Sequence, residues 1–254
     1  AVKQFQANLE KYLDVKHVIP CGNGTDALQI SMMALGLQPG DEVITPSFTF
    51  IATAEVIALL GLTPVFVDVD PDTFTLKMDE VEKSITSNTK AILPVHLFGQ
   101  CADMNRIMQL AGKHNLSVIE DTCQAIGAEY TLNDGSRQQA GTMGDLGAMS
   151  FFPSKNLGTF GDGGAIFTNN DDLAEKCRSI TNHGMKRRYY HDDIGVNSRL
   201  DSLHAAILDV KLKYLDTYTS RRQKAAEYYN RAFEAIPQLQ TPVVRKDSTH
   251  VYHQ

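Results

Sequence analysis

Leu116-Ser-Val-Ile-Glu-Asp121 is a short apolar run that ends in two carboxylates, a pattern typical of a buried β-strand. Three similar segments precede it in the chain, at residues 42–45, 64–68 and 91–95. Between the last of these and residue 117, apolar residues recur at helical spacing: Met104, Ile107, Met108 and Ala111. Strands that alternate with helices over short connections form βαβ units. The sequence therefore predicts an α/β fold with a mostly parallel central sheet between helices.

The C-terminal part of the chain carries one long helical pattern. Its apolar stripe predicts a single helix from about Leu200 to Ala235: Leu203, Ile207, Val210 and Tyr214. Pro237 and Pro242 then interrupt the pattern, because proline lacks the N–H that a helix interior needs. We therefore expect a large domain at residues 1–235 and the truncated opening of a small C-terminal domain at residues 236–254.

Composition and charge exclude several classes of protein. The apolar fraction of 43% and the charged fraction of 21% are ordinary for a globular protein, and a formal charge of -6 argues against nucleic acid as a partner. No apolar run reaches the length of about 18 residues that a membrane span needs, and the histidines lack metal-binding spacing. The widely spaced cysteines are expected to be reduced thiols, which indicates a cytoplasmic protein.

Two side chains beyond strand ends predict a cofactor. Ligands of such sheets bind past the carboxyl ends of strands, where Asp121 lies, and Ser150-Phe-Phe-Pro-Ser-Lys155 puts a lysine in a loop beside two phenylalanines. Pyridoxal 5'-phosphate (PLP) needs a lysine amine for its aldehyde and a carboxylate that keeps its pyridine nitrogen protonated. Alone, Lys155 could be a solvated surface charge and Asp121 a helix N-cap. As a pair they predict a PLP enzyme.

The other candidate residues each have a structural alternative. Asn23-Gly24-Thr25-Asp26 opens a helix whose first N–H groups could bind a phosphate, or Thr25 could simply be the N-cap. Ser150 could add a hydroxyl to the same phosphate. Phe50 could stack on a flat ring or fill the core, and Gln124 could bond a ring hydroxyl or face a loop.

A series of motifs follows one order along the chain: Gly24-Thr-Asp-Ala-Leu28, Gly40-Asp-Glu-Val-Ile44, Phe48-Thr-Phe-Ile-Ala-Thr53, Pro94-Val-His96, Glu120-Asp121, Ser150 to Lys155, Gly161-Asp-Gly-Gly164 and Gly195-Val-Asn-Ser-Arg-Leu200. Together they resemble the DegT/DnrJ/EryC1/StrS family of sugar aminotransferases. The resemblance implies a PLP-dependent transferase of aspartate-aminotransferase fold type I. Relative to that family, the chain lacks the usual N-terminal segment and most of the small C-terminal domain.

The resemblance implies a role for each candidate residue. Lys155 would be the Schiff-base lysine and Asp121 the partner of the pyridinium nitrogen. The remaining cofactor contacts would be Gln124 at the ring hydroxyl, Phe50 stacked on the ring, and Gly24, Thr25, the Asp26 backbone and Ser150 at the phosphate. Asn197 would reach the phosphate of the neighbouring subunit's cofactor, so the protein would be a homodimer with shared active sites.

Within the family, Tyr189-Tyr-His191 followed by Gly195-Val-Asn-Ser-Arg199 most resembles enzymes that aminate a UDP-linked 3-keto-2-acetamido-hexuronate for surface polysaccharide or O-antigen synthesis. The implied reaction is a ping-pong transamination from L-glutamate to a nucleotide-linked keto sugar. Arg199 would bind a substrate carboxylate, or form a structural salt bridge instead. Three alternatives stay open: a UDP- or dTDP-linked 3-keto or 4-keto deoxysugar as substrate, a sugar dehydratase, which the retained Lys155 disfavours, and a non-catalytic ligand-binding regulator.

Overall fold

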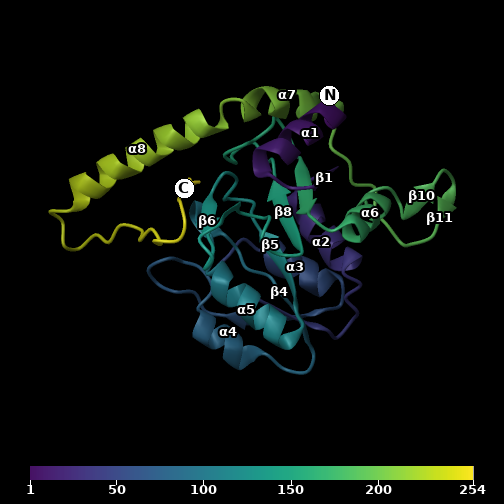
Figure 1. Ribbon diagram of the computed structural model, residues 1–254, viewed down its shortest axis with the longest axis horizontal. Helices are drawn as coiled ribbons and strands as arrows, with labels where there is room; N and C mark the ends of the chain where they lie inside the picture. Colours follow the sequence, from purple (N-terminus) through teal and green to yellow (C-terminus); the bar gives the residue numbers. More distant parts are fainter. Residues whose placement is uncertain (254) are drawn as a thin grey trace.

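A seven-stranded sheet forms the centre of the computed structural model, which describes residues 1–253 (Figure 1). The strand order is β1-β9-β8-β5-β4-β2-β3. These strands are β1 (His17–Cys21), β2 (Glu42–Pro46), β3 (Thr63–Val67), β4 (Thr89–Ile92), β5 (Ser117–Asp121), β8 (Leu146–Ser150) and β9 (Gly164–Thr168). Two small hairpins accompany the sheet, β6 (Glu129–Thr131) with β7 (Arg137–Gln139), and β10 (Met185–Arg187) with β11 (Tyr190–His191).

The strands from β8 to β3 run parallel to one another, whereas β9 pairs in antiparallel fashion with both β8 and β1. The predicted mostly parallel sheet is therefore confirmed, and the apolar runs at 42–45, 64–68, 91–95 and 117–120 correspond to β2 to β5. Strand β4 ends earlier than predicted, at Ile92, although Val95 still forms a parallel bridge with Asp121. This bridge brings the segment after β4 to the carboxyl end of β5.

Helices cover both faces of the sheet. Apolar side chains of α2, α3 and α6 pack on one face, and those of α1, α4, α5 and α7 pack on the other. The helices are α1 (Val2–Leu13), α2 (Gly24–Ala34), α3 (Ala52–Leu59), α4 (Met78–Ser84), α5 (Met104–His114), α6 (Asp171–Ile180), α7 (Ser202–Leu212) and α8 (Leu215–Phe233). No helix within residues 1–253 combines the length and the hydropathy that a membrane span requires.

The long C-terminal helix predicted from the sequence is wrong in two respects. The structure divides it into α7 and α8, which meet at Tyr214, where φ is -112° and ψ is 2°. The predicted apolar stripe also lies largely outside the core, since Leu203, Val210 and Tyr214 are exposed. Helix α7 instead packs against α1 through these residues: Ala205, Leu208 and Leu212.

The reason is that the apolar residues of this region occupy more than one face of the helix, so spacing alone does not select the face that meets α1. A smaller misassignment of the same kind occurs in α5, where Met104, Ile107 and Ala111 are buried as predicted. Leu110 completes the buried face, whereas Met108 is partly exposed.

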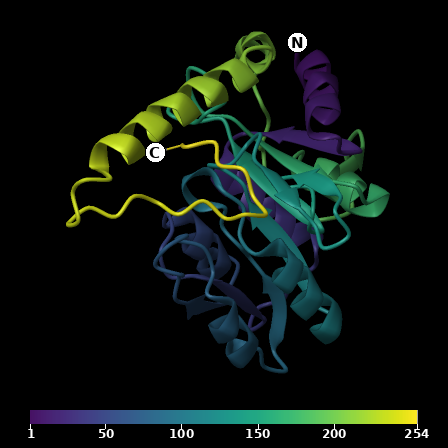
Figure 2. The ribbon, with the colours of Figure 1, turned by 60° about the vertical axis from the view of Figure 1, so that its left-hand side comes forward.

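The segment after α8 runs back towards the sheet (Figure 2). Its last residues lie against the body of the molecule, with Ser248 bridged to Tyr130 and His250 bridged to Gln100. Arg222 of α8 holds the same segment through the carbonyl oxygens of Tyr252 and His253, at 3.0 and 3.2 Å. The division into a large domain and the start of a small one stays a prediction.

Candidate active site

A cavity of about 660 Å³ lies where the carboxyl ends of β5 and β8 meet the first turn of α2. Most of the candidate residues from the sequence line this cavity: Gly24, Thr25, Asp26, Phe50, Asp121, Gln124, Ser150 and Lys155. The other lining residues were assigned no role from the sequence, among them Thr49, Thr53, Cys123 and His253. The candidates Asn197 and Arg199 do not line the cavity.

Asp121 ends β5 and is 6% exposed. Its Oδ2 accepts a hydrogen bond from Thr53 Oγ1 at 3.0 Å, and its Oδ1 accepts one from the Cys123 N–H at 3.2 Å. A carboxylate can accept about four hydrogen bonds, so these two donors orient Asp121 and leave it with capacity to bind a further donor. The segment that follows is not a helix, so the alternative role of Asp121 as a helix N-cap is wrong.

The adjacent carboxylate, Glu120, is directed to the opposite face of the sheet, where it is fully buried. Its two oxygens accept hydrogen bonds from the N–H groups of Gly141, Met143 and Gly144, at 2.9, 2.7 and 2.6 Å. His96 Nε2 supplies a fourth donor at 2.8 Å. His96 Nδ1 accepts from the Ala102 N–H, so the ring proton must be on Nε2. Glu120 is thus saturated with hydrogen bonds.

Lys155 lies in the loop that follows β8, and the side chain is half-buried at the cavity. Phe151 is buried beneath this loop, and the Lys155 N–H donates to the Phe152 carbonyl oxygen at 2.9 Å. Within residues 1–253, the Lys155 amine forms no hydrogen bond and no ion pair. The amine is therefore available to a ligand that enters the cavity.

The first turn of α2 forms another wall of the cavity. Its N-cap is Asn23 and not Thr25, because Asn23 Oδ1 accepts from the Asp26 N–H at 2.8 Å. That bond engages the Asp26 N–H that the resemblance assigned to the phosphate. The N–H groups at the start of a helix have no intrahelical acceptor, so Gly24 and Thr25 supply the backbone donors of this turn. A Cβ at Gly24 would lie 2.7 Å from Ser150 Cβ, so only glycine permits this approach.

Phe50 and Gln124 differ in how firmly the structure holds them. Phe50 is 68% exposed at the cavity, so it is not a core residue. Gln124 Oε1 accepts from the Phe98 N–H at 2.7 Å, which leaves its amide nitrogen as a donor.

Asn197 and Arg199 are both exposed on the segment between β11 and α7. No ion pair of Arg199 occurs in the described part of the chain, so the salt bridge considered from the sequence is absent.

Burial changes the acid–base behaviour of two lining residues. Desolvation, followed by the nearby Asp121 carboxylate, raises the pKa of the Cys123 thiol well above its usual range, so this thiol stays protonated. Desolvation also lowers the pKa of His253 to about 4, helped by the charges of Lys155 and Arg222, so this imidazole is uncharged at neutral pH. Residues 1–253 contain no cluster of side chains suited to a metal ion.

The residues present fit PLP. Asp121 retains acceptor capacity for a ring N–H, the Lys155 amine is unpaired in the described chain, and the closely packed turn at Gly24 offers N–H groups to a phosphate. The α/β fold and this cavity define a PLP-dependent transferase of fold type I.

Comparison with known proteins identifies the group within this class. The model of the DegT/DnrJ/EryC1/StrS aminotransferase family matches residues 1–254, and the chain belongs to that family. It is 51% identical over its full length to a pleiotropic regulatory protein of Geobacillus stearothermophilus, of which it covers 67%. It is 48% identical, again over its full length, to UDP-2-acetamido-2-deoxy-3-oxo-D-glucuronate aminotransferase of Pseudomonas aeruginosa, of which it covers 69%.

The fold agrees equally well with solved structures. The crystal structure of S. venezuelae DesV in complex with a ketimine intermediate superposes with a TM-score of 0.94 at 42% identity, and the match covers 99% of this chain and 67% of DesV. The chain thus spans about two thirds of the length of these relatives. The protein is a PLP-dependent aminotransferase.

Proposed function

We propose that this protein transfers an amino group from L-glutamate to a nucleotide-linked keto sugar, in a cytoplasmic step of surface-polysaccharide synthesis. The observation that carries the proposal is that the Lys155 amine and the Asp121 carboxylate face one cavity, each with hydrogen-bonding capacity to spare. The 48% identity to the Pseudomonas aeruginosa enzyme supports a UDP-linked 3-keto-2-acetamido-hexuronate as the sugar.

PLP supplies an aromatic ring that withdraws electrons from the carbon being deprotonated. Asp121 would accept a hydrogen bond from the protonated ring nitrogen of PLP, and Thr53 and Cys123 fix the orientation of its carboxylate. Lys155 would hold the cofactor through Nζ. When free, the same amine would take the Cα proton of the donor amino acid and would later return a proton to the sugar carbon that receives nitrogen.

Other residues hold and orient the ligands. The N–H groups of Gly24 and Thr25 and the Ser150 hydroxyl would bind the cofactor phosphate, since a helix N-terminus attracts anions. The free amide nitrogen of Gln124 would donate to the ring hydroxyl, and the exposed ring of Phe50 would cover the cofactor face.

A second subunit completes the site in this proposal. Asn197 is exposed and outside its own chain's cavity, which suits a role in the neighbouring subunit of a homodimer. The exposed stripe of α7 supports such an assembly, because Leu203 and Val210 present apolar surface to a partner.

Arg199 favours a uronate over a neutral deoxysugar. Its guanidinium is exposed and has no ion-pair partner in the described chain, and a guanidinium binds carboxylates through two parallel hydrogen bonds. A hexuronate carries such a carboxylate, whereas a UDP- or dTDP-linked deoxysugar does not. The α-carboxylate of L-glutamate is the other candidate for this contact.

The test uses the full-length protein with PLP and L-glutamate. We expect 2-oxoglutarate release with the UDP-linked 3-keto-hexuronate and much less with neutral keto deoxysugars. Arg199→Ala should raise KM for the uronate but not for a neutral analogue. Borohydride reduction of the holoprotein should place the label on Lys155. A label elsewhere, or loss of a sugar hydroxyl without 2-oxoglutarate, would overturn the proposal.

A further inference from the structure

His253 is the cavity residue that comes from farthest along the chain. It is 7% exposed and lines the same cavity as Lys155, although it belongs to the segment that follows α8. The resemblance used in the sequence analysis assigned no role to it. It therefore places an uncharged imidazole in the cavity that Lys155 also lines.

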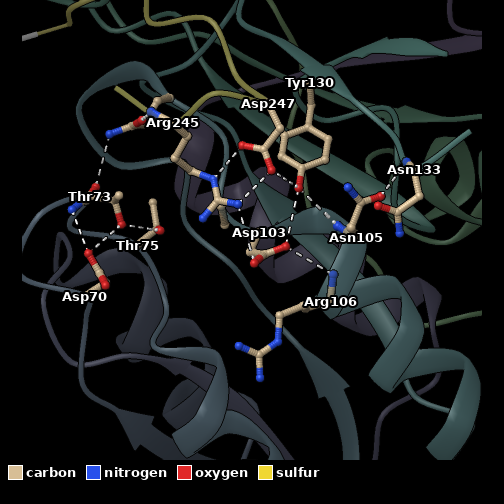
Figure 3. Close-up of polar contacts among 12 residues, drawn as sticks. Asp70, Thr73, Thr75, Asp103, Asn105, Arg106, Tyr130, Asn133, Arg245 and Asp247 are labelled. Carbon is tan, nitrogen blue, oxygen red and sulfur yellow. Dashed lines mark hydrogen bonds and ion pairs between the residues drawn. The ribbon is translucent and has the colours of Figure 1, made fainter. Parts of the chain in front are cut away.

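The segment that carries His253 is held firmly at its upstream end (Figure 3). Arg245 contacts both oxygens of Asp247, at 2.9 and 2.8 Å, and lies 3.4 Å from Asp103. The buried Tyr130 hydroxyl donates to Asp247 Oδ2 at 2.9 Å. These contacts join the segment to the start of α5 and to β6, so its path to the cavity is fixed.

Asn156 fixes the other end of the segment. Asn156 Nδ2 donates to the Val251 carbonyl oxygen at 3.1 Å, and Asn156 Oδ1 lies 3.2 Å from His253 Nδ1. The His253 N–H also donates to the Phe98 carbonyl oxygen at 2.9 Å. Since Asn156 directly follows Lys155 in the chain, this side-chain amide connects the lysine loop to His253.

The hydrogen bonds determine which nitrogen of His253 carries the proton. The Val251 carbonyl can only accept, so the Asn156 amide must present its oxygen to His253. Nδ1 of the uncharged ring therefore carries the hydrogen, and Nε2 has a free lone pair. Among the residues that the structure describes, no donor occupies Nε2.

We propose that His253 is a positioning residue for Lys155: its Nε2 accepts a hydrogen bond from the ε-amino group whenever that group is not attached to the cofactor. The inference rests on the proposed function. An ammonium group has three donors, and the Lys155 amine forms no hydrogen bond within residues 1–253. The contact with His253 Nε2 forms when the amine turns within the cavity that both residues line. A carboxylate at this place would hold the ammonium as a strong ion pair. A neutral acceptor orients the amine and still releases it for proton transfer.

Two amide substitutions in the full-length holoenzyme separate the two nitrogens. His253→Asn places an amide near Nδ1, so it keeps the bond to Asn156 but has no acceptor at Nε2. His253→Gln extends an amide to the place of Nε2 and gives up the bond to Asn156. We expect kcat to fall about tenfold for His253→Asn, the size expected for one hydrogen bond, with KM nearly unchanged. His253→Gln should recover most of the activity.

The matched control is His250→Asn, in the same segment but outside the cavity, which should keep a kcat near that of the unchanged protein. Rates are normalised to the amount of Lys155 labelled by borohydride, so that unfolded protein does not contribute. The inference is overturned if His253→Asn keeps full kcat, or if His253→Gln is the slower of the two. Failure of the proposed function would appear differently, as absence of the label on Lys155 in the unchanged protein.

Discussion

Glu120 and Asp121 are neighbouring carboxylates at the end of β5, and they face opposite sides of the sheet. Glu120 accepts three backbone N–H groups and the His96 ring N–H. Asp121 accepts one backbone N–H and the Thr53 hydroxyl. Both are buried, so burial does not distinguish them. They differ in the number of free acceptor sites: Glu120 has none, whereas Asp121, which faces the cavity, has about two.

This difference follows from the alternation of side chains along a strand. One face of β5 meets the turn at residues 141–144, which closes around Glu120 and ties β5 to the approach of β8. The other face meets α2 and α3 and opens into the cavity. The end of β5 thus carries two carboxylates with different roles. Glu120 fixes the strand end through its hydrogen bonds, and this holds Asp121 in position to bind a ligand.

The strongest test of the comparison is Asp121→Asn. An amide cannot stabilise a proton on a ring nitrogen as a carboxylate does, so we expect kcat/KM to fall by at least about a hundredfold. The free energy of unfolding should change by less than about 1 kcal/mol, because only two hydrogen bonds are altered. Steady-state kinetics and denaturant titration measure the two quantities. A large loss of stability with activity retained would reverse the roles assigned to the two residues.

Glu120→Gln should show the opposite pattern. The new NH2 group meets N–H donors on every side, which leaves buried donors unpaired and costs about 2–4 kcal/mol of stability. Thermal unfolding of holoprotein would detect this as a lower Tm. The activity of the protein that remains folded, normalised to labelled Lys155, should stay near that of the unchanged protein. If the normalised rate of Glu120→Gln fell as far as that of Asp121→Asn, Glu120 would have a role in catalysis as well as in stability.

A smaller effect is expected from the hydroxyl that orients Asp121. Thr53→Val removes the 3.0 Å donor to Asp121 Oδ2 without changing the size of the side chain. One hydrogen bond of this kind is worth about 1 kcal/mol, so kcat/KM should fall roughly fivefold. Thr53→Ser restores the hydroxyl and should restore the rate. Equal rates for the valine and serine variants would mean that Asp121 needs no orienting donor.

A separate test concerns mild acid, whose effect on stability must be distinguished from the effects of the two carboxylates. Burial lowers the pKa of His250 and of His253 to about 4, below the value of about 6.5 in an unfolded chain. Between these values the unfolded chain binds more protons, so stability is complete above pH 6.5 and declines as the pH falls towards 4. Urea titrations across this range should show the slope, and His250→Asn should reduce it. A stability independent of pH would exclude these imidazoles as its source.

Sequence reasoning recovered the sheet and the residues whose chemistry is unusual for their position. Apolar runs located β2 to β5 because buried strands need them, and Lys155 was found because it stands among aromatic and glycine residues. The pairing of Glu120 with the turn at 141–144 was not predictable, since it depends on β5 and β8 becoming neighbours. His253 escaped for the same reason, because only the path of the segment after α8 brings it to Asn156 and to the cavity that Lys155 lines.

The tight contact between Gly24 and Ser150 restricts how this protein could be redesigned. No side chain larger than hydrogen fits at position 24, because a Cβ there would lie 2.7 Å from Ser150 Cβ and 3.0 Å from Cys123 Sγ. Mutagenesis libraries aimed at new substrates should therefore leave position 24 unchanged.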